Sequence, residues 1–186
     1  MTPTREQVLM LVDKYSQATK QHLHQVGRIM EYFGQKLGQD SQYWWTIGIL
    51  HDIDRDYIEK NGERHLKEDF DKICDEVNLT PEARGDIRSH GHFLPWIIEK
   101  PDTLIRKYIN AVDELSGFIW AYFRMIPSAD VMEIKSSSIR KKLKDASFAA
   151  WVDRGEAFNC ETMLWIPLEE FVEDIKLALK GGEWKK

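Results

Sequence analysis

The sequence predicts an all-α fold in a single domain. Apolar residues recur at helical spacing along nearly the whole chain, and no stretch alternates convincingly between apolar and polar residues as a half-buried strand would. Strong helix-start signals separate the periodic stretches, the clearest being Thr80-Pro81, in which an N-cap threonine precedes proline. A length of 186 residues suits one domain with a substantial core.

Each expected helix has a local signal. Thr4 and Gln7 have the spacing of a capping box at the first helix. Asp40 is a good N-cap for the third, and Gly38 is a natural stop for the second. The later helices follow the same apolar period. In chain order we expect helices from Thr4, over 19–37, over 43–52, from Asn61 or Gly62 to Val77, from Pro81 to His90, over 103–125 and over 168–179.

The helix over 43–52 is apolar on almost every face, so we expect it at the centre of the bundle. It ends on the dipeptide His51-Asp52, just before the polar segment 55–62, which we expect to form a loop. A histidine and an aspartate at the end of a central helix, next to a loop, are candidates for a functional site.

The composition excludes several classes of protein. The chain has 31 acidic and 26 basic residues, so no general positive field attracts nucleic acid, and we expect no strong nucleic-acid binding. No apolar run approaches the roughly 20 residues of a membrane span. Two distant cysteines and the absence of a secretory leader after Met1 favour a reducing cytoplasm. The sequence leaves the oligomeric state open.

Several histidines and aspartates lie on inner helix faces or at helix ends. Imidazole and carboxylate are ligands that divalent transition metals accept, and helices of a bundle can bring them together. One such histidine alone is more often a packed core residue, whereas several together favour a metal. His24 faces away from its neighbour on the same helix, and His92 is as well explained by solvent exposure. The candidate ligands are His22, His51, Asp52, His65, His90 and Asp113.

Adjacent residues on a helix diverge by about 100°. His51 and Asp52 can therefore reach one ion only near a helix end, or if the carboxylate bridges two ions. Asp52 is accordingly the natural bridging ligand of a binuclear site.

The order of these residues and their local contexts resemble the HD-domain superfamily of metal-dependent phosphohydrolases. The resemblance is carried by QHLHQVGRIM around His22, GILHDIDRD around His51-Asp52 and NAVDELSGFIWA around Asp113, and it continues through KSSSIRKKLKDASFAAWVDRG. It is closest to the small stand-alone bacterial HD hydrolases. It implies a single HD domain over 1–186, with a metal-binding core over about 19–125 and a helical extension over about 128–180.

The resemblance also implies a ligand set. His22, His51, Asp52 and Asp113 match the four ligands of the shared metal site. In members with two metals, Asp52 bridges and His65 and His90 complete the second site. The segment around His65 matches the family pattern only loosely, so a site with one ion is the alternative. The cofactor is a divalent transition metal, expected as two ions, chosen from Mn, Fe, Co, Ni and Zn.

The implied reaction is hydrolysis of a phosphate ester of a small metabolite or nucleotide by metal-activated water. Asp52 belongs to the catalytic centre, and Asp54 could act as base or orient the water. The candidate substrate-binding residues are Arg55, Ser116, Lys135 and Lys142. Each of these candidates also has a structural alternative. Asp54 and Arg55 could be exposed groups at a helix end, Lys135 and Lys142 could belong to a solvated basic helix face, and the Ser116 hydroxyl could bond to its own helix.

Two other functions fit the same ligand order. A mixed-valent di-iron oxygenase can use the same ligand set, and spacing alone does not separate it from a hydrolase. A metal-stabilised, non-catalytic domain that binds a ligand is the third possibility, which we consider weaker because no ligand position is missing.

Overall fold

The computed structural model describes residues 3–58, 62–128 and 130–182, and these residues form α-helices, short 3-10 helices, turns and no strand. The predicted all-α fold is therefore confirmed. The chain divides into two compact units, Met1–Ile109 and Asn110–Lys186. The assignment of one domain to 1–186 stays a prediction.

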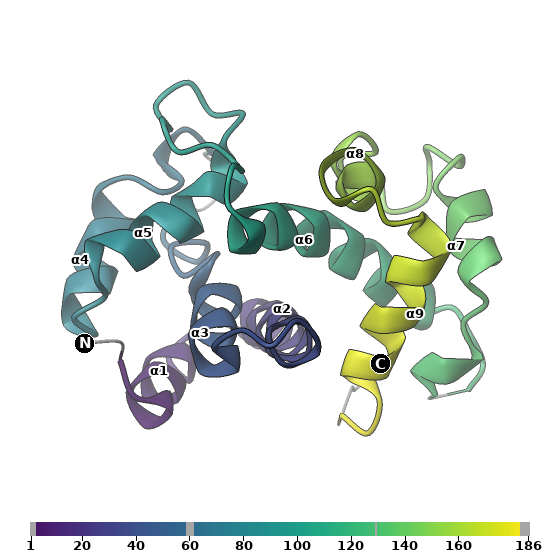
Figure 1. Cartoon of the computed structure of the whole chain (residues 1–186), viewed down its shortest axis with the longest axis horizontal. Helices are drawn as coiled ribbons and strands as arrows, with labels where there is room; N and C mark the ends of the chain where they lie inside the picture. The colour runs from purple at the N-terminus through teal and green to yellow at the C-terminus, as the bar shows by residue number, and fades with distance from the viewer. Residues whose placement is uncertain (1–2, 59–61, 129, 183–186) are drawn as a thin grey trace. The chain divides into compact units, whose positions relative to one another are not determined.

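Helix α3 (Ser41–Leu50) is the centre of the first unit. It contacts α1 (Arg5–Val12), α2 (Gln17–Lys36) and α5 (Pro81–Arg88), as Figure 1 shows. Every residue from Trp44 to Leu50 is buried, which confirms the central position expected from its apolar sequence. The other elements of this unit are η1 (Gly62–Arg64), α4 (Glu68–Glu76) and η2 (Ser89–Gly91), and α6 (Leu104–Phe123) begins here and crosses into the second unit.

The predicted helix starts are confirmed at three positions. Thr4 accepts a hydrogen bond from the Gln7 N–H while the Gln7 side chain accepts one from the Thr4 N–H, which completes the capping box. The side chains of Asp40 and Thr80 cap α3 and α5 by accepting hydrogen bonds from the N–H groups of Tyr43 and Ala83. These caps depend only on neighbouring residues, so the sequence was sufficient to find them.

Helices α2 and α3 approach closely because glycine lies at their contact. A Cβ atom added at Gly27 of α2 would lie 2.8 Å from Ile49 Cβ and 3.3 Å from Ile49 Cα. One added at Gly48 of α3 would lie 2.8 Å from the Val26 carbonyl oxygen. Since main-chain atoms and Cβ cannot rotate away, any larger residue would force the two helices apart.

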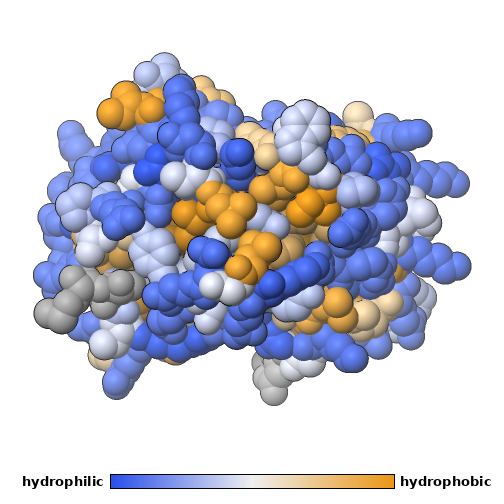
Figure 2. Space-filling view, viewed as in Figure 1, coloured by the Kyte–Doolittle hydropathy of each residue, from blue (hydrophilic) through white to orange (hydrophobic). Residues whose placement is uncertain are grey.

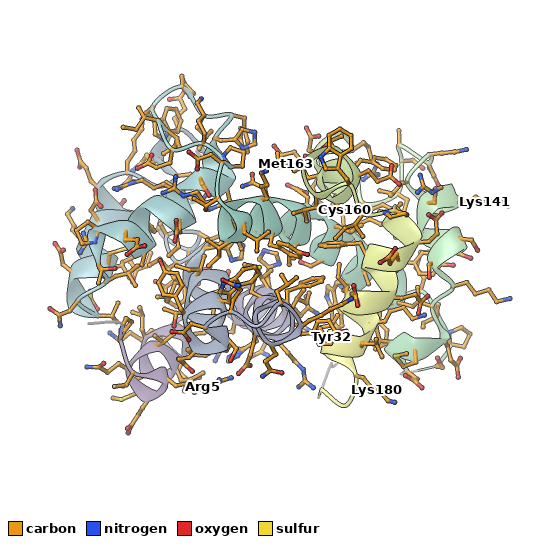
Figure 3. The ribbon with its side chains drawn as sticks, viewed as in Figure 1. Arg5, Tyr32, Lys141, Cys160, Met163 and Lys180 are labelled. Carbon is orange, nitrogen blue, oxygen red and sulfur yellow. The ribbon has the colours of Figure 1, made fainter. Side chains whose placement is uncertain are left out.

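Arg5 fastens α1 to its neighbours. Its guanidinium lies 2.7 Å from Glu31 Oε1 of α2 and 4.2 Å from the ring centre of Trp45 of α3. The side chain is labelled in Figure 3. One residue thus joins three helices through an ion pair and a cation–π contact.

The predicted helix from Asn61 or Gly62 to Val77 is wrong in its first half. Asn61 lies outside the described residues, Gly62–Arg64 form a 3-10 turn, and the α-helix begins only at Glu68. Leu66 interrupts the helix with a φ of 59°. Its N–H donates to Asp54 Oδ2 at 2.5 Å, and this contact with a distant residue replaces the helical hydrogen bond.

In the second unit, α9 (Leu168–Leu179) contacts α7 (Ser136–Lys142) and α8 (Asn159–Leu164). The bounds of α9 match the prediction. Arg140 of α7 lies 2.5 Å from Glu161 of α8 and 2.5 Å from Glu169 of α9. Arg140 therefore joins α7 to α8 and α9, whereas the neighbouring Lys141 points outward into solvent (Figure 3). The unit also contains η3 (Val131–Glu133) and η4 (Glu156–Phe158).

The face drawn in Figure 2 is largely hydrophilic, with apolar groups between charged side chains. Of the large apolar side chains that the structure describes, the most exposed are Trp165, Ile98 and Trp151, at 86%, 84% and 74%. Among the described residues, no helix has the length and apolar character needed to cross a membrane.

The glycine contact between α2 and α3 predicts a large effect of Gly27→Ala. The added methyl group meets atoms of fixed position, so we expect the free energy of unfolding to fall by about 1–3 kcal/mol, as for other overpacked interiors. Chemical denaturation measures the change.

Gly117→Ala is the matched control, since Gly117 is also helical and no atom of the described residues lies within 4 Å of its added Cβ. We expect no loss there, and a gain of up to about 1 kcal/mol from helix propensity. Equal stability of Gly27→Ala and the wild type would contradict the close packing.

Candidate metal centre

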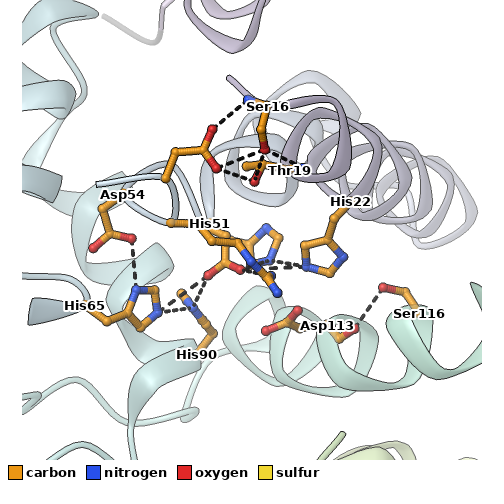
Figure 4. Close-up of polar contacts among 12 residues, drawn as sticks. Ser16, Thr19, His22, His51, Asp54, His65, His90, Asp113 and Ser116 are labelled. Carbon is orange, nitrogen blue, oxygen red and sulfur yellow. Dashed lines mark hydrogen bonds and ion pairs between the residues drawn. The ribbon is translucent and has the colours of Figure 1, made fainter. Parts of the chain in front are cut away.

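Five of the six predicted ligands lie together in the first unit. Figure 4 shows the four histidines among them, His22, His51, His65 and His90. His22 comes from α2, while His51 and Asp52 follow the last turn of α3. His65 lies on the turn between η1 and α4, and His90 lies on η2. Residues separated by up to 68 positions in sequence thus meet because α2, α5 and the turn after η1 surround the end of α3.

The four histidines form two pairs. His22 Nε2 lies 3.1 Å from His51 Nε2, and His65 Nε2 lies 3.1 Å from His90 Nε2. In each pair the same ring nitrogen points at its counterpart. All four side chains are buried or largely buried, with exposures between 0% and 17%.

Asp52 lies between the two pairs. Its Oδ2 is 3.8 Å from Nε2 of both His22 and His51. Its Oδ1 is 3.6 Å from His65 Nε2 and 3.5 Å from His90 Nε2. Each carboxylate oxygen therefore faces one histidine pair, which is the orientation that a bridging carboxylate requires.

Hydrogen bonds at the opposite ring nitrogens fix the tautomers of three histidines. The Nδ1–H groups of His51 and His90 donate to the carbonyl oxygens of Gly48 and Ile87, at 2.7 Å and 2.6 Å. His65 Nδ1–H donates to Asp54 Oδ1 at 2.9 Å. Carbonyl and carboxylate oxygens only accept, so we assign the proton to Nδ1 and the lone pair to Nε2 of each neutral ring. Nε2 is thus the atom available to a metal.

The donor set fits metal binding. In a neutral pair such as His65 and His90, two lone pairs face each other at 3.1 Å, which is unfavourable unless a cation lies between them. Nitrogen ligands about 2.0–2.1 Å from one ion lie about 2.8–3.0 Å apart at a right angle and about 3.3–3.4 Å apart at the tetrahedral angle. The observed separation lies between these values. The ligand atoms of Asp52, His65 and His90 all lie within 4.8 Å of one another.

The charge distribution also suits a cation. Burial by itself raises the pKa of Asp52, but its electrostatic interactions with His51, His90 and His65 outweigh burial. Together they hold the pKa of this carboxyl well below its ordinary value. Asp52 is therefore an ionised carboxylate among imidazole groups, and a cation bound there would balance its negative charge.

Two further predicted residues lie beside this centre. Asp54 is fully buried, and its two oxygens accept hydrogen bonds from His65 and from the N–H of Leu66. Arg55 is half-exposed, and its Nη1 lies 2.7 Å from Asp52 Oδ2. The guanidinium that we predicted as a phosphate ligand is thus in direct contact with the central carboxylate.

The remaining predicted residues belong to the second unit. Asp113 and Ser116 lie one turn apart on α6, and the buried Ser116 hydroxyl donates to the Asp113 carbonyl at 2.8 Å. Lys135 is exposed at the start of α7, and Lys142 Nζ lies 2.8 Å from Asp145. Metal binding by Asp113 and substrate binding by Ser116, Lys135 and Lys142 stay predictions.

The sequence did not reveal the residues that hold His65 in place. Trp96 donates its indole N–H to the His65 carbonyl at 3.0 Å, across 31 positions. Leu66 packs so closely on Gly91 that an added Cβ there would lie 2.7 Å from Leu66 Cδ1. Neither contact has a local sequence signal, because both depend on the path of the chain between α5 and α6.

Comparison with known proteins agrees with this geometry. The family model described as HD domain matches residues 19–117, more than half of the chain. The matched range includes all six candidate ligands. Searches of curated proteins and of solved structures returned no significant match. The order of the histidines and aspartates, the two histidine pairs around Asp52 and this match lead to one conclusion: the chain belongs to the HD-domain family, whose members are generally metal-dependent hydrolases.

Proposed function

We propose that this protein is a metal-dependent phosphohydrolase that cleaves a phosphate ester of a small metabolite or nucleotide. The observation that carries the proposal is the position of Asp52, with one oxygen toward His22 and His51 and the other toward His65 and His90. Membership of the HD-domain family supports the reaction class.

The proposed centre holds two divalent transition-metal ions. His22 and His51 would hold one ion, His65 and His90 would hold the other, and Asp52 would be a ligand shared by both. We further propose Asp113 as a ligand of the first ion, because it lies within the residues matched by the family model. When bound, such ions lower the pKa of coordinated water and polarise phosphoryl oxygens.

The protein's own groups then orient the substrate. Arg55 is half-exposed next to Asp52, so its guanidinium can turn from the carboxylate to a phosphate oxygen. Its planar donors suit a phosphate group better than a single ammonium would. Lys135, Lys142 and Ser116 are proposed as further substrate contacts, with Lys142 exchanging Asp145 for phosphate.

Metal binding is the first test. We expect Mn²⁺, or another of Fe²⁺, Co²⁺, Ni²⁺ and Zn²⁺, to raise the melting temperature of chelator-treated protein. At a free concentration 100 times the Kd, the stabilisation is about 2.7 kcal/mol for one site. Thermal denaturation with and without each metal measures it.

His22→Ala should weaken this stabilisation, whereas His24→Ala should preserve it. Both histidines lie on α2, but two residues along a helix turn the side chain about 200° away. Absence of a metal-dependent shift with all five ions would remove the basis for an enzyme and leave a helical binding domain.

The second test separates the roles of Asp52 and His65. We expect Asp52→Ala to lose both ions and all hydrolysis, because this carboxylate faces both histidine pairs. His65→Ala should mainly weaken the binding of the second ion. Elemental mass spectrometry of protein purified without a chelating tag gives the metal content, and phosphate release is screened with monoesters, diesters and cyclic nucleotides.

Full metal content in Asp52→Ala would rule out the bridging role. If the metal is iron, oxygen uptake is measured in parallel, because an oxygen-dependent reaction without phosphate release would indicate the di-iron oxygenase. Two bound ions with neither reaction would favour a non-catalytic ligand-binding domain.

A further inference from the structure

We propose that Asp54 is a positioning residue that fixes His65 and thereby forms the second metal position. The inference rests on the proposed function in one respect, since it takes His65 as a metal ligand. Asp54 itself contacts neither histidine of the first pair in any of its described hydrogen bonds, so its effect should be confined to the second pair.

His65 needs an external support because it lies outside a helix. The Nδ1–H groups of His51 and His90 each donate to the carbonyl three residues earlier in the chain, a bond that the end of a helical turn provides locally. His65 sits on a turn, next to Leu66 with its φ of 59°. Its Nδ1 partner instead comes from 11 residues earlier, from Asp54.

One carboxylate holds both the ring and the main chain. Asp54 Oδ1 accepts from His65 Nδ1 at 2.9 Å, and Asp54 Oδ2 accepts from the Leu66 N–H at 2.5 Å. The first bond sets the rotation and tautomer of the imidazole, and the second holds the turn that carries it. Since Asp54 is fully buried, water does not compete for either oxygen.

The consequence is a defined direction for His65 Nε2. With Nδ1 fixed, Nε2 lies 3.1 Å from His90 Nε2 and 3.6 Å from Asp52 Oδ1. A carboxylate partner also increases the basicity of a metal-binding imidazole. Both oxygens of Asp54 are already engaged, one by the Nδ1–H of His65 and the other by the N–H of Leu66, so these contacts support a positioning role in place of the predicted role as catalytic base.

The test is Asp54→Asn in the full-length protein. The amide keeps the size of the side chain but has one accepting oxygen in place of two, so either His65 or Leu66 loses its acceptor. We expect the second Mn²⁺ to bind about 10- to 100-fold more weakly, as when other supporting groups of metal ligands are removed. The first Mn²⁺ should bind as in the wild type. Titration calorimetry of chelator-treated protein resolves the two events.

Asp56→Asn is the matched control. Asp56 belongs to the same segment and also accepts several hydrogen bonds, but from Ser16 and Thr19 at the start of α2. We expect this variant to lose stability and to keep both metal affinities. Unchanged binding of two ions by Asp54→Asn, or equal weakening by Asp56→Asn, would overturn the positioning role.

A second measurement needs neither metal nor activity. Nitrogen-15 NMR of the metal-free wild type should show neutral His65 with its proton on Nδ1, and Asp54→Asn should show a mixture of tautomers. A proton on Nε2 in the wild type would refute the proposal even if the variant failed to fold. If the wild type shows the Nδ1 tautomer but binds fewer than two ions, the proposed binuclear function fails while the support of His65 by Asp54 remains.

Discussion

The contact between α2 and α3 is the constraint on which the rest of the first unit depends. Gly27 and Gly48 let the two helices approach until a single added carbon atom would meet main-chain or Cβ atoms. This distance sets the separation of His22 and His51, because one lies on α2 and the other directly follows α3. A looser contact would leave both helices intact and still separate the first histidine pair. The close packing of α2 and α3 therefore determines the distance between two candidate ligands as well as the stability of the unit.

The centre itself is a polar cluster inside an apolar interior. Burying four imidazoles and two carboxylates is costly unless each polar atom has a partner. The structure meets this requirement at the outer ring nitrogens, where Gly48, Ile87 and Asp54 accept hydrogen bonds. The inner nitrogens face one another around Asp52. Imidazole rings that are hydrogen-bonded at the outer nitrogen and carry a lone pair on the inner nitrogen are well suited to bind a cation.

Three aspartates after α3 organise three different parts of the unit. Asp52 faces the histidine pairs, and Asp56 accepts hydrogen bonds from Ser16 and Thr19 at the start of α2. Asp54 holds the turn of His65 (Figure 4). The short segment therefore connects the candidate metal centre to elements that lie before and after it in sequence. The residues that follow the His51-Asp52 pair, Asp54 and Asp56, thus hold neighbouring segments in place.

The sequence by itself determined the helical fold class, the helix caps and the order of the candidate ligands. These features depend on neighbouring residues or on apolar period, which is why Thr4, Asp40 and Thr80 were found as caps. Only the tertiary structure decided that the helix expected before Val77 breaks at Leu66, and that Asp54 and Trp96 hold His65. These contacts join residues 11 to 31 positions apart, and they override the local preference for a helix. A sequence pattern reports only that local preference, so it could not predict the break.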